Sequence, residues 1–214
     1  MNIFDRSQHV YISPSFDEII KETIRFFDAT PVHSLPIAER FQGTGVYALY
    51  CIPQSGIYSK FNALNQTAFR LPIYVGKAVP KGWRQARQFS PVQGKSYELS
   101  NRLREHSRNL NYGEGLEISD FFCRFIILEN KATALIGTIE AALIQKYKPI
   151  WNTLIDGFGN HDPGKGRYQQ AKSDWDVCHP GRAWAQKCRG VPADREELYR
   201  KIEDFLNDLD EEEI

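Results

Sequence analysis

Two short runs of sequence decide the fold, GTGVYALYCI at residues 43–52 and LPIYVG at residues 71–76. Both runs are rich in β-branched and aromatic residues and are bounded by glycine or proline, which is typical of short strands. A tyrosine stands in the middle of each run, Tyr47 and Tyr74, two residues from a glycine. If the strands are neighbours in register, both hydroxyl groups can point toward one place. A strand tyrosine is also an ordinary packing residue, so the pattern needs support from elsewhere in the chain.

The remaining periodic sequence predicts mainly helices. Apolar residues recur at helical spacing in four segments, at 13–27, 96–110, 133–147 and 195–209. Residues 121–128 form an apolar run that is typical of a buried strand. Residues 53–70 are polar and irregular, and they are too many for a hairpin turn. We therefore interpret them as an insertion that serves surface recognition or dimer contact.

Length and composition indicate one ordinary globular domain. The chain has 214 residues, of which 42% are hydrophobic and 25% charged, which excludes disordered, fibrous and membrane classes. The longest apolar run, at 132–144, is too short to span a bilayer, and residues 1–10 lack a signal pattern, so we expect a cytoplasmic protein. The four cysteines form no C-x-x-C pair, which favours free thiols.

The net charge of zero is the sum of two unlike parts. Residues 194–214 hold 10 acidic and 3 basic residues, and the rest of the chain therefore carries an excess of seven basic residues. Within that rest, residues 77–108 hold eight basic residues against two acidic ones. This stretch is a candidate phosphate-facing surface that includes Lys77 and Arg104. A solvated face would explain the same run, so charge alone does not decide.

Glu140 breaks the apolar pattern of the helix predicted at 133–147. Helical spacing places it between Ile144 and Tyr147, on the apolar face. An unpaired carboxylate there is costly, so it must be protonated, meet an arginine or bind a metal cation at the edge of the core. A buried salt bridge is the plain alternative. Magnesium commonly binds near phosphates through one carboxylate and several waters.

Arg102 and His106 lie four residues apart on the helix predicted at 96–110, beside its leucine stripe. An ordinary boundary arginine and a satisfied histidine would explain them if the helix stood alone. Together with Glu140 they predict a phosphate clamp and a proton acceptor facing a metal. Asn152, just past the second helix, can donate to a phosphate or to a metal-bound water, or it is a simple turn residue.

The segment at 157–189 has no periodicity and mixes basic with aromatic residues. Its GKGR string lacks the spacing of a P-loop, so we expect no nucleotide cofactor. Its two cysteines and one histidine lack zinc-finger spacing. We expect the segment to contact DNA, where arginine can read guanine edges. The expected DNA-contacting side chains are Lys165, Arg167, His179 and Arg182, with Trp175 and Trp184.

Five separated elements occur in the order Gly45-Val46-Tyr47, Tyr74-Val75-Gly76, Arg102 with His106, Glu140 and Asn152. This order resembles the GIY-YIG nuclease superfamily over roughly residues 43–155. Valine replaces the middle isoleucine of both tripeptides, and histidine stands where many relatives carry tyrosine. The chain shows no second catalytic or DNA-binding domain, so it looks most like the type II restriction endonuclease branch.

The resemblance implies an α+β fold in which a small antiparallel sheet, three-stranded or slightly larger, is flanked by helices. It divides the single domain into an N-terminal extension at 1–42, a catalytic core at 43–155, and a loop and amphipathic helix with an acidic tail at 156–214. It also implies cleavage of DNA phosphodiester bonds. The alternatives are a structure-specific repair or recombination nuclease and a non-catalytic DNA-binding module on the same scaffold.

The roles of the site residues follow from the same resemblance. Glu140 would hold the one divalent cation, magnesium or alternatively manganese, and Arg102 would bind the scissile phosphate. Asn152 would orient the phosphate or the water shell of the cation.

Two tyrosines and a histidine complete the implied site. Tyr47, assisted by His106, would take the proton of the attacking water, and Tyr74 would position water or phosphate. A free tyrosine has a pKa of about 10, so either Tyr47 or His106 remains the candidate general base.

The implied partner is double-stranded DNA. One site cuts one strand, so cleavage of both strands of a symmetric sequence calls for a homodimer. The helix at 195–209 and the insertion at 53–70 are candidates for its interface, with packing inside one chain as the alternative.

Overall fold

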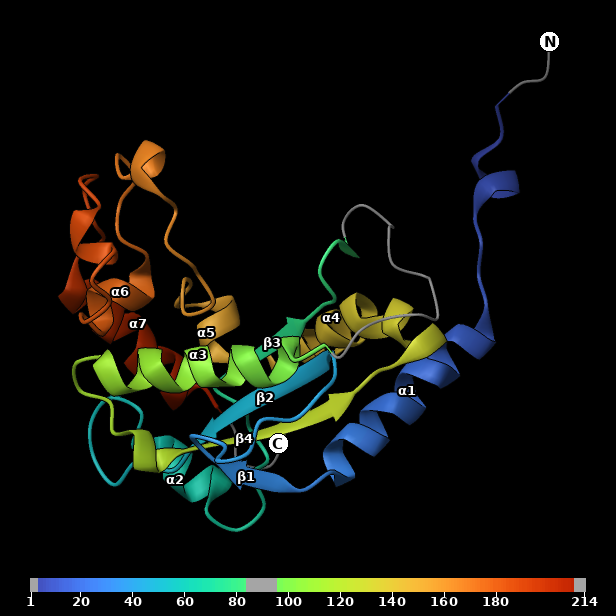
Figure 1. Cartoon of the computed structure of the whole chain (residues 1–214), viewed down its shortest axis with the longest axis horizontal. Coiled ribbons are helices and arrows are strands. Elements are labelled where there is room, and N and C mark those ends of the chain that lie inside the picture. The colour runs from blue at the N-terminus through green and yellow to red at the C-terminus, as the bar shows by residue number, and fades with distance from the viewer. Residues whose placement is uncertain (1–3, 84–95, 210–214) are drawn as a thin grey trace.

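The protein is built on one four-stranded sheet. The computed structural model describes residues 4–83 and 96–209, so part of the basic stretch, at 84–95, and the end of the acidic tail, at 210–214, lie outside the described residues. All strand pairs are antiparallel and the strand order is β1-β4-β2-β3 (Figure 1). The strands are β1 (Val32–Ser34), β2 (Gly45–Cys51), β3 (Tyr74–Ala78) and β4 (Phe121–Ile127). The expected small antiparallel sheet flanked by helices is confirmed.

The register of β2 and β3 explains the two glycines of the tyrosine strands. Gly76 pairs with Tyr47, and a Cβ atom on Gly76 would overlap the Tyr47 hydroxyl group. On β2, a Cβ atom on Gly45 would overlap the backbone oxygen of Ile126 in β4. Glycine at both positions lets a ring or a neighbouring strand approach closely. Tyr74 pairs with Leu49, so both tyrosines project from the same face of the sheet.

One face of the sheet is covered by α1 (Pro14–Ala29) and α4 (Ile136–Tyr147), which contact each other. Their apolar stripes pack on the side chains that β2, β3 and β4 direct to this face. The core on this side contains Phe27, Val46, Ala48, Tyr50, Val75, Ile126, Ile139 and Leu143. Glu140 lies next to this packed stripe on α4, which brings it to the edge of the core as expected.

The other face carries both site tyrosines and a second layer of helices. The layer consists of α2 (Lys60–Asn65), α3 (Glu98–Tyr112), α5 (Ile150–Thr153), α6 (Asp174–Cys178) and α7 (Arg195–Asn207). Short 3-10 helices occur in the described residues at Arg6–His9, before α1, and between later elements at Ile118–Asp120, Asn130–Leu135, Lys165–Arg167 and Ala185–Lys187. Figure 1 shows α3 running across the sheet, with residues 156–190 beside the C-terminal end of this helix. We call residues 156–190 the C-terminal lobe.

The two segments proposed for a dimer interface pack inside the chain. Within 53–70, Tyr58 and Phe61 are buried, and the Asn65 side chain bonds the backbone on both sides of the segment. On α7 the apolar face, with Leu198 and Ile202, packs into the same core as the site tyrosines. The alternative of packing within one chain describes both segments.

The four cysteines are free thiols. Cys51, Cys123 and Cys178 are buried, and Cys188 in the C-terminal lobe is partly exposed. Within the described residues, no helix is long and apolar enough to cross a membrane.

Candidate active site

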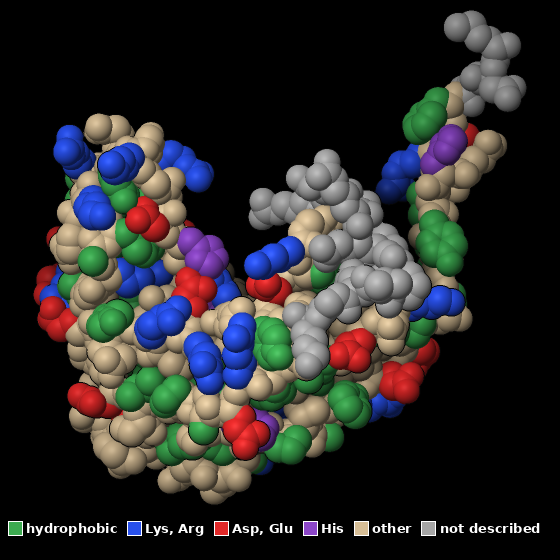
Figure 2. All heavy atoms as spheres, viewed as in Figure 1, with side chains coloured by type: hydrophobic (Ala, Val, Ile, Leu, Met, Phe, Trp, Pro, Cys, Tyr) green, Lys and Arg blue, Asp and Glu red, His purple; other side chains and the backbone are tan. Residues whose placement is uncertain are grey.

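Residues from three distant parts of the chain line one cleft of about 510 Å³. Strand β3 contributes Tyr74, helix α3 contributes Arg102, and helix α4 contributes Glu140. Figure 2 shows this side of the molecule as a hollow, with charged side chains on its floor and a histidine on one wall. Three of the predicted site residues therefore meet at one opening.

Glu140 is paired in the cleft with Lys77. The Lys77 ammonium lies 2.5 Å from Oε2 of Glu140, and the Glu140 side chain is 17% exposed. Lys77 comes three residues after Tyr74, so β3 carries both a site tyrosine and the partner of the carboxylate. Of the expected explanations for Glu140, the described residues show a salt bridge, formed with a lysine and open to the cleft.

The donor set fits a cation that keeps most of its water. No cluster of three or more His, Cys, Asp or Glu residues that could hold a metal occurs in the described ranges, 4–83 and 96–209. A zinc site would need such a cluster, whereas magnesium is commonly held by one or two carboxylates together with phosphate and water. Glu140 would be the protein ligand of such a cation, which would have to share Oε2 with the Lys77 ammonium or displace it.

Arg102 is held at the cleft wall by three acceptors. Its guanidinium donates to Glu105 Oε2 at 2.8 Å, to His161 Nε2 at 2.9 Å and to the Gly159 carbonyl at 2.6 Å. Two of these partners belong to the C-terminal lobe. A planar guanidinium offers five donors in a fixed fork, which suits a phosphate. The lobe therefore sets where this fork points.

Tyr47 and His106 form a buried pair behind Tyr74. The Tyr47 hydroxyl lies 2.6 Å from His106 Nε2, and both side chains are fully buried. Burial, and next the Tyr74 hydroxyl, raises the pKa of Tyr47 well above its ordinary value. Burial, and next the charge of Arg102, lowers the pKa of His106 well below its ordinary value. Both groups are therefore held neutral in this state.

Aromatic side chains cover the Tyr47–His106 pair. Phe158 stacks on His106 with 4.5 Å between ring centroids and meets Tyr74 edge-on at 4.9 Å. The Nδ1 atom of His106 is buried and has no hydrogen-bond partner among the described residues. Burial also raises the pKa of Tyr74. Of the two tyrosines, Tyr74 is the one that lines the cleft.

Asn152 holds strand β3 in place. Its side-chain oxygen accepts from the Val75 amide at 2.7 Å, and its side-chain nitrogen donates to the Val75 carbonyl at 2.9 Å. Val75 lies between Tyr74 and Gly76 in the strand. The carboxamide is thus engaged with the backbone, where sequence predicts a contact with phosphate or with metal-bound water. In this structure Asn152 positions Tyr74.

Among the predicted DNA-contacting residues, four are accessible. Lys165 and Arg167 are exposed on the short turn that leads through the C-terminal lobe. Arg104 is exposed on α3 and donates to the Ala38 carbonyl, and Lys77 lines the cleft.

His179 and Arg182 lie inside the fold instead of facing DNA. His179 is bonded between the Tyr58 hydroxyl and the Glu114 carbonyl, each at 3.0 Å. Arg182 forms a buried ion pair with Asp176 and lies over the ring of Trp175, which is also buried. Both side chains are nearly inaccessible, so the prediction of DNA contact is corrected for them and for Trp175.

Arg182 braces the lobe from within. Its guanidinium donates to the carbonyls of Gly157, Phe158 and Asn160 and stacks between Trp175 and Trp184, 4.7 Å from each ring centroid. These carbonyls belong to the segment that contacts Arg102. The brace therefore connects the interior of the lobe to the cleft.

Sequence reasoning missed four residues that complete the site, one on α3 and three in the C-terminal lobe. Glu105, Phe158, Gly159 and His161 contact Arg102, His106 or Tyr74. Glu105 was recognisable as the neighbour of Arg102 one turn along the same helix. The other three lie in the segment GFGNHDPGKG, at residues 157–166, which has no periodicity and gives no signal of what it packs against.

The antiparallel sheet, the tyrosines on its two neighbouring strands, and the arginine and glutamate on flanking helices define a nuclease domain of the GIY-YIG class. The chain belongs to the family described as Eco29kI GIY-YIG domain, whose sequence pattern matches residues 39–206. This is a family of type II restriction endonucleases, which act on DNA. No curated protein matches the chain.

Proposed function

We propose that the protein is a sequence-specific endonuclease that hydrolyses double-stranded DNA with one divalent cation, magnesium or manganese, at each site. The observation that carries the proposal is the convergence of Glu140, Arg102 and Tyr74 on one cleft, from a helix, another helix and a strand far apart in sequence. A structural role alone does not require an acid, a guanidinium and a phenol at the same opening.

The chemistry of the chain centres on Arg102. The guanidinium binds the scissile phosphate and stabilises the charge that builds on it in the transition state. Tyr74, held by Asn152 through the strand backbone, positions the phosphate or the attacking water. Glu140 is the residue that holds the cation, which when bound supplies charge neutralisation at the phosphate and the leaving oxygen.

Tyr47 and His106 remain candidates for accepting the proton of water, because their buried hydrogen bond lies directly behind Tyr74. In the free protein both are neutral, so this role needs the cleft to rearrange when DNA binds. Apo geometry commonly differs from the reacting complex in this way.

The accessible basic side chains support a duplex-binding surface around the cleft. Lys165 and Arg167 extend from the C-terminal lobe, and Arg104 lies on the exposed side of α3. Such groups bind phosphates and give an affinity that falls with salt, whereas base contacts from the lobe would give sequence selectivity. We propose a homodimer for cutting both strands, and the cytoplasm as the place of action.

Digestion of a mapped plasmid with the purified protein and magnesium tests this function. Discrete fragments support a restriction activity, whereas a smear or intact plasmid contradicts it. Cleavage of branched but not linear DNA would favour a structure-specific nuclease.

Glu140→Ala should lower cleavage by at least about a hundredfold, because the charge stabilisation at the scissile phosphate is lost. Rates are measured from the disappearance of supercoiled plasmid at several magnesium concentrations. Glu22→Gln, on an exposed position of α1, is the matched control and should cleave like the unmodified protein. Full activity of Glu140→Ala would remove the assigned metal ligand.

A further inference from the structure

A histidine outside the predicted set, His161, lines the cleft. His161 Nδ1 lies 2.7 Å from Glu105 Oε1, and Nε2 lies 2.9 Å from the guanidinium of Arg102. A guanidinium can only donate, so Nε2 accepts and Nδ1 carries the proton that bonds Glu105. In this arrangement His161 connects the Arg102 guanidinium to the Glu105 carboxylate.

The charged groups that line the cleft cancel within residues 4–83 and 96–209. In these ranges three basic groups and three acidic groups line the cleft from β3, α3 and α4. These groups are Lys77, Arg102 and Arg108 against Glu98, Glu105 and Glu140. Tyr74 adds no charge because burial raises its pKa. The neighbouring Asp162 is not part of the lining, and hydrogen bonds from the Gly164 amide and the Tyr168 hydroxyl lower its pKa and keep it charged. With a neutral His161 the described part of the lining has no net charge and by itself gives a phosphodiester anion little attraction.

One proton on His161 changes this balance. Glu105 already bonds its Nδ1 and would stabilise the imidazolium, while Nε2 would become a charged donor beside Arg102. An incoming phosphate can accept the hydrogen bond that Arg102 now donates to His161 Nε2. This would leave Nε2 free to bind a proton. Histidine changes charge in the range between about pH 5 and pH 8, where DNA-binding proteins work.

We propose that His161 is a phosphate-binding residue of the cleft, which takes up a proton when DNA binds and donates it in a hydrogen bond to the phosphate held by Arg102. The inference deepens the proposed function and rests on it. It makes DNA affinity depend on pH through one side chain.

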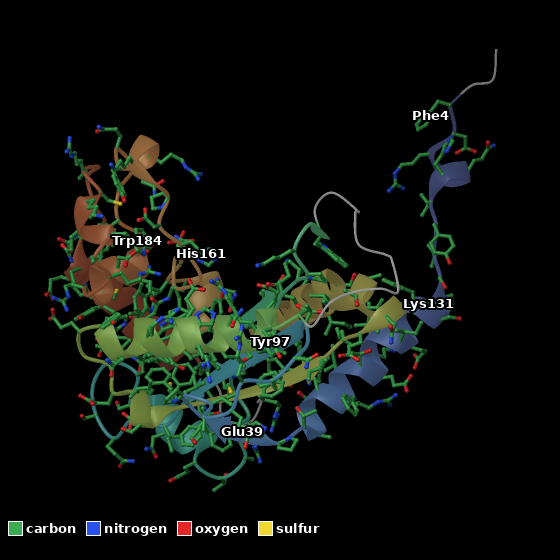
Figure 3. All side chains as sticks on the ribbon, viewed as in Figure 1. Phe4, Glu39, Tyr97, Lys131, His161 and Trp184 are labelled. Carbon is green, nitrogen blue, oxygen red and sulfur yellow. The ribbon has the colours of Figure 1, made fainter. Side chains whose placement is uncertain are left out.

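The His161 side chain is 66% exposed and lines the cleft. Figure 3 shows His161 on the side of the C-terminal lobe that faces the hollow. The preceding residues are fixed by Arg182 through the carbonyls of Gly157, Phe158 and Asn160. Lys165, an expected DNA contact, follows four residues later in the chain. The same segment thus connects the lobe's DNA contacts with the catalytic arginine.

Fluorescence anisotropy with a short labelled duplex of mixed sequence, in buffer with EDTA, measures the effect without cleavage. The affinity of the unmodified protein should increase by about three- to tenfold between about pH 8 and pH 6, the size of a partly exposed charged contact. His161→Gln keeps a neutral donor, so it should bind like the unmodified protein at pH 8 and gain little at pH 6. His9→Gln, an exposed histidine outside the cleft, should retain the full pH response.

Glu105→Gln tests the charge balance from the other side. Removing this negative charge should raise affinity at about pH 8 by a few-fold, because the charge of Arg102 is no longer cancelled. Circular dichroism at both pH values verifies that each variant is folded. An unchanged pH response in His161→Gln, or weaker binding of Glu105→Gln at pH 8, overturns the inference.

The outcome separates this inference from the proposed function. A His161-dependent pH response without any plasmid cleavage in magnesium keeps the phosphate contact and rejects the nuclease. Plasmid cleavage together with an identical pH response in His161→Gln keeps the nuclease and rejects the contact.

Discussion

Gly76 shows how a single residue determines the position of a site tyrosine. It pairs with Tyr47 across β2 and β3, and an added Cβ would overlap the Tyr47 hydroxyl and lie 2.9 Å from the Tyr74 ring. The space that glycine leaves is therefore filled by the ring that bonds His106. This explains in physical terms why glycine follows Tyr74 by two residues within β3.

Gly76→Ala should destabilise the protein by about 1–3 kcal/mol, because it overpacks a buried site. It should also disturb the bond between Tyr47 and His106 and reduce cleavage. Urea unfolding measures the stability change. Gly137→Ala is the control, since Gly137 lies in α4 with no atom near its absent Cβ, and alanine there should stabilise by about 0.5–1 kcal/mol. Equal unfolding midpoints for Gly76→Ala and the unmodified protein would contradict this account.

The location of residues that break a periodic pattern could be predicted from the sequence. The location of residues in segments without periodicity could not. Arg102 and Glu140 stood out because charge at the edge of an apolar stripe is costly, and the cleft explains both. His179 and Arg182 looked like DNA contacts because polar loop residues are usually exposed. Their burial depends on Asp176 and the Glu114 carbonyl, partners that only the folded chain brings near.

At the scale of elements, long periodic segments were predictable and short ones were not. The four predicted helices and three predicted strands occur, with ends shifted by a few residues. Strand β1 has three residues and depends on its pairing with β4, so its sequence carries little signal. Helix α2 was not predicted, because it lies in a polar, irregular stretch of sequence. Its buried side chains, such as Phe61, pack against distant parts of the core.

The C-terminal lobe depends on one buried ion pair. Arg182→Met leaves Asp176 without its partner and three carbonyls without their donor, so the cost should be about 3–5 kcal/mol. Limited proteolysis should then cut within 156–190, and cleavage of plasmid should fall because Arg102 loses its supports from the lobe. Arg189→Met, at an exposed position, is the matched control.

A second variant keeps this prediction testable if the first unfolds. Asp176→Asn combined with Arg182→Met removes the isolated charge and should be more stable than Arg182→Met alone. If the single variant resists protease as well as the unmodified protein does, the ion pair is not what holds the lobe.

At the scale of the whole molecule, two buried histidines connect stability with pH. Burial lowers the pKa of His179 to about 4 and lowers that of His106 well below its ordinary value. The unfolded chain binds these protons near pH 6.5, so below that pH it holds more protons than the folded protein. Their contribution to stability is complete above about pH 6.5 and is lost as the pH falls toward 4.

The free energy of unfolding should therefore fall on acidification by up to about 1.4 kcal/mol per pH unit for each histidine. Urea titrations between about pH 7.5 and pH 4.5 measure the slope. His179→Asn should lower stability at neutral pH, because the bonds to Tyr58 and Glu114 are lost, and should also reduce the slope. A slope that stays the same in this variant would show that other groups cause the acid sensitivity.

The uneven exposure of the four thiols offers a natural attachment point. Three of them are buried in the core, and Cys188 is partly exposed on the lobe that contacts Arg102. A maleimide dye added to the native protein would react chiefly there, without any engineered mutation. Its emission would then report how this part of the molecule responds when a duplex arrives.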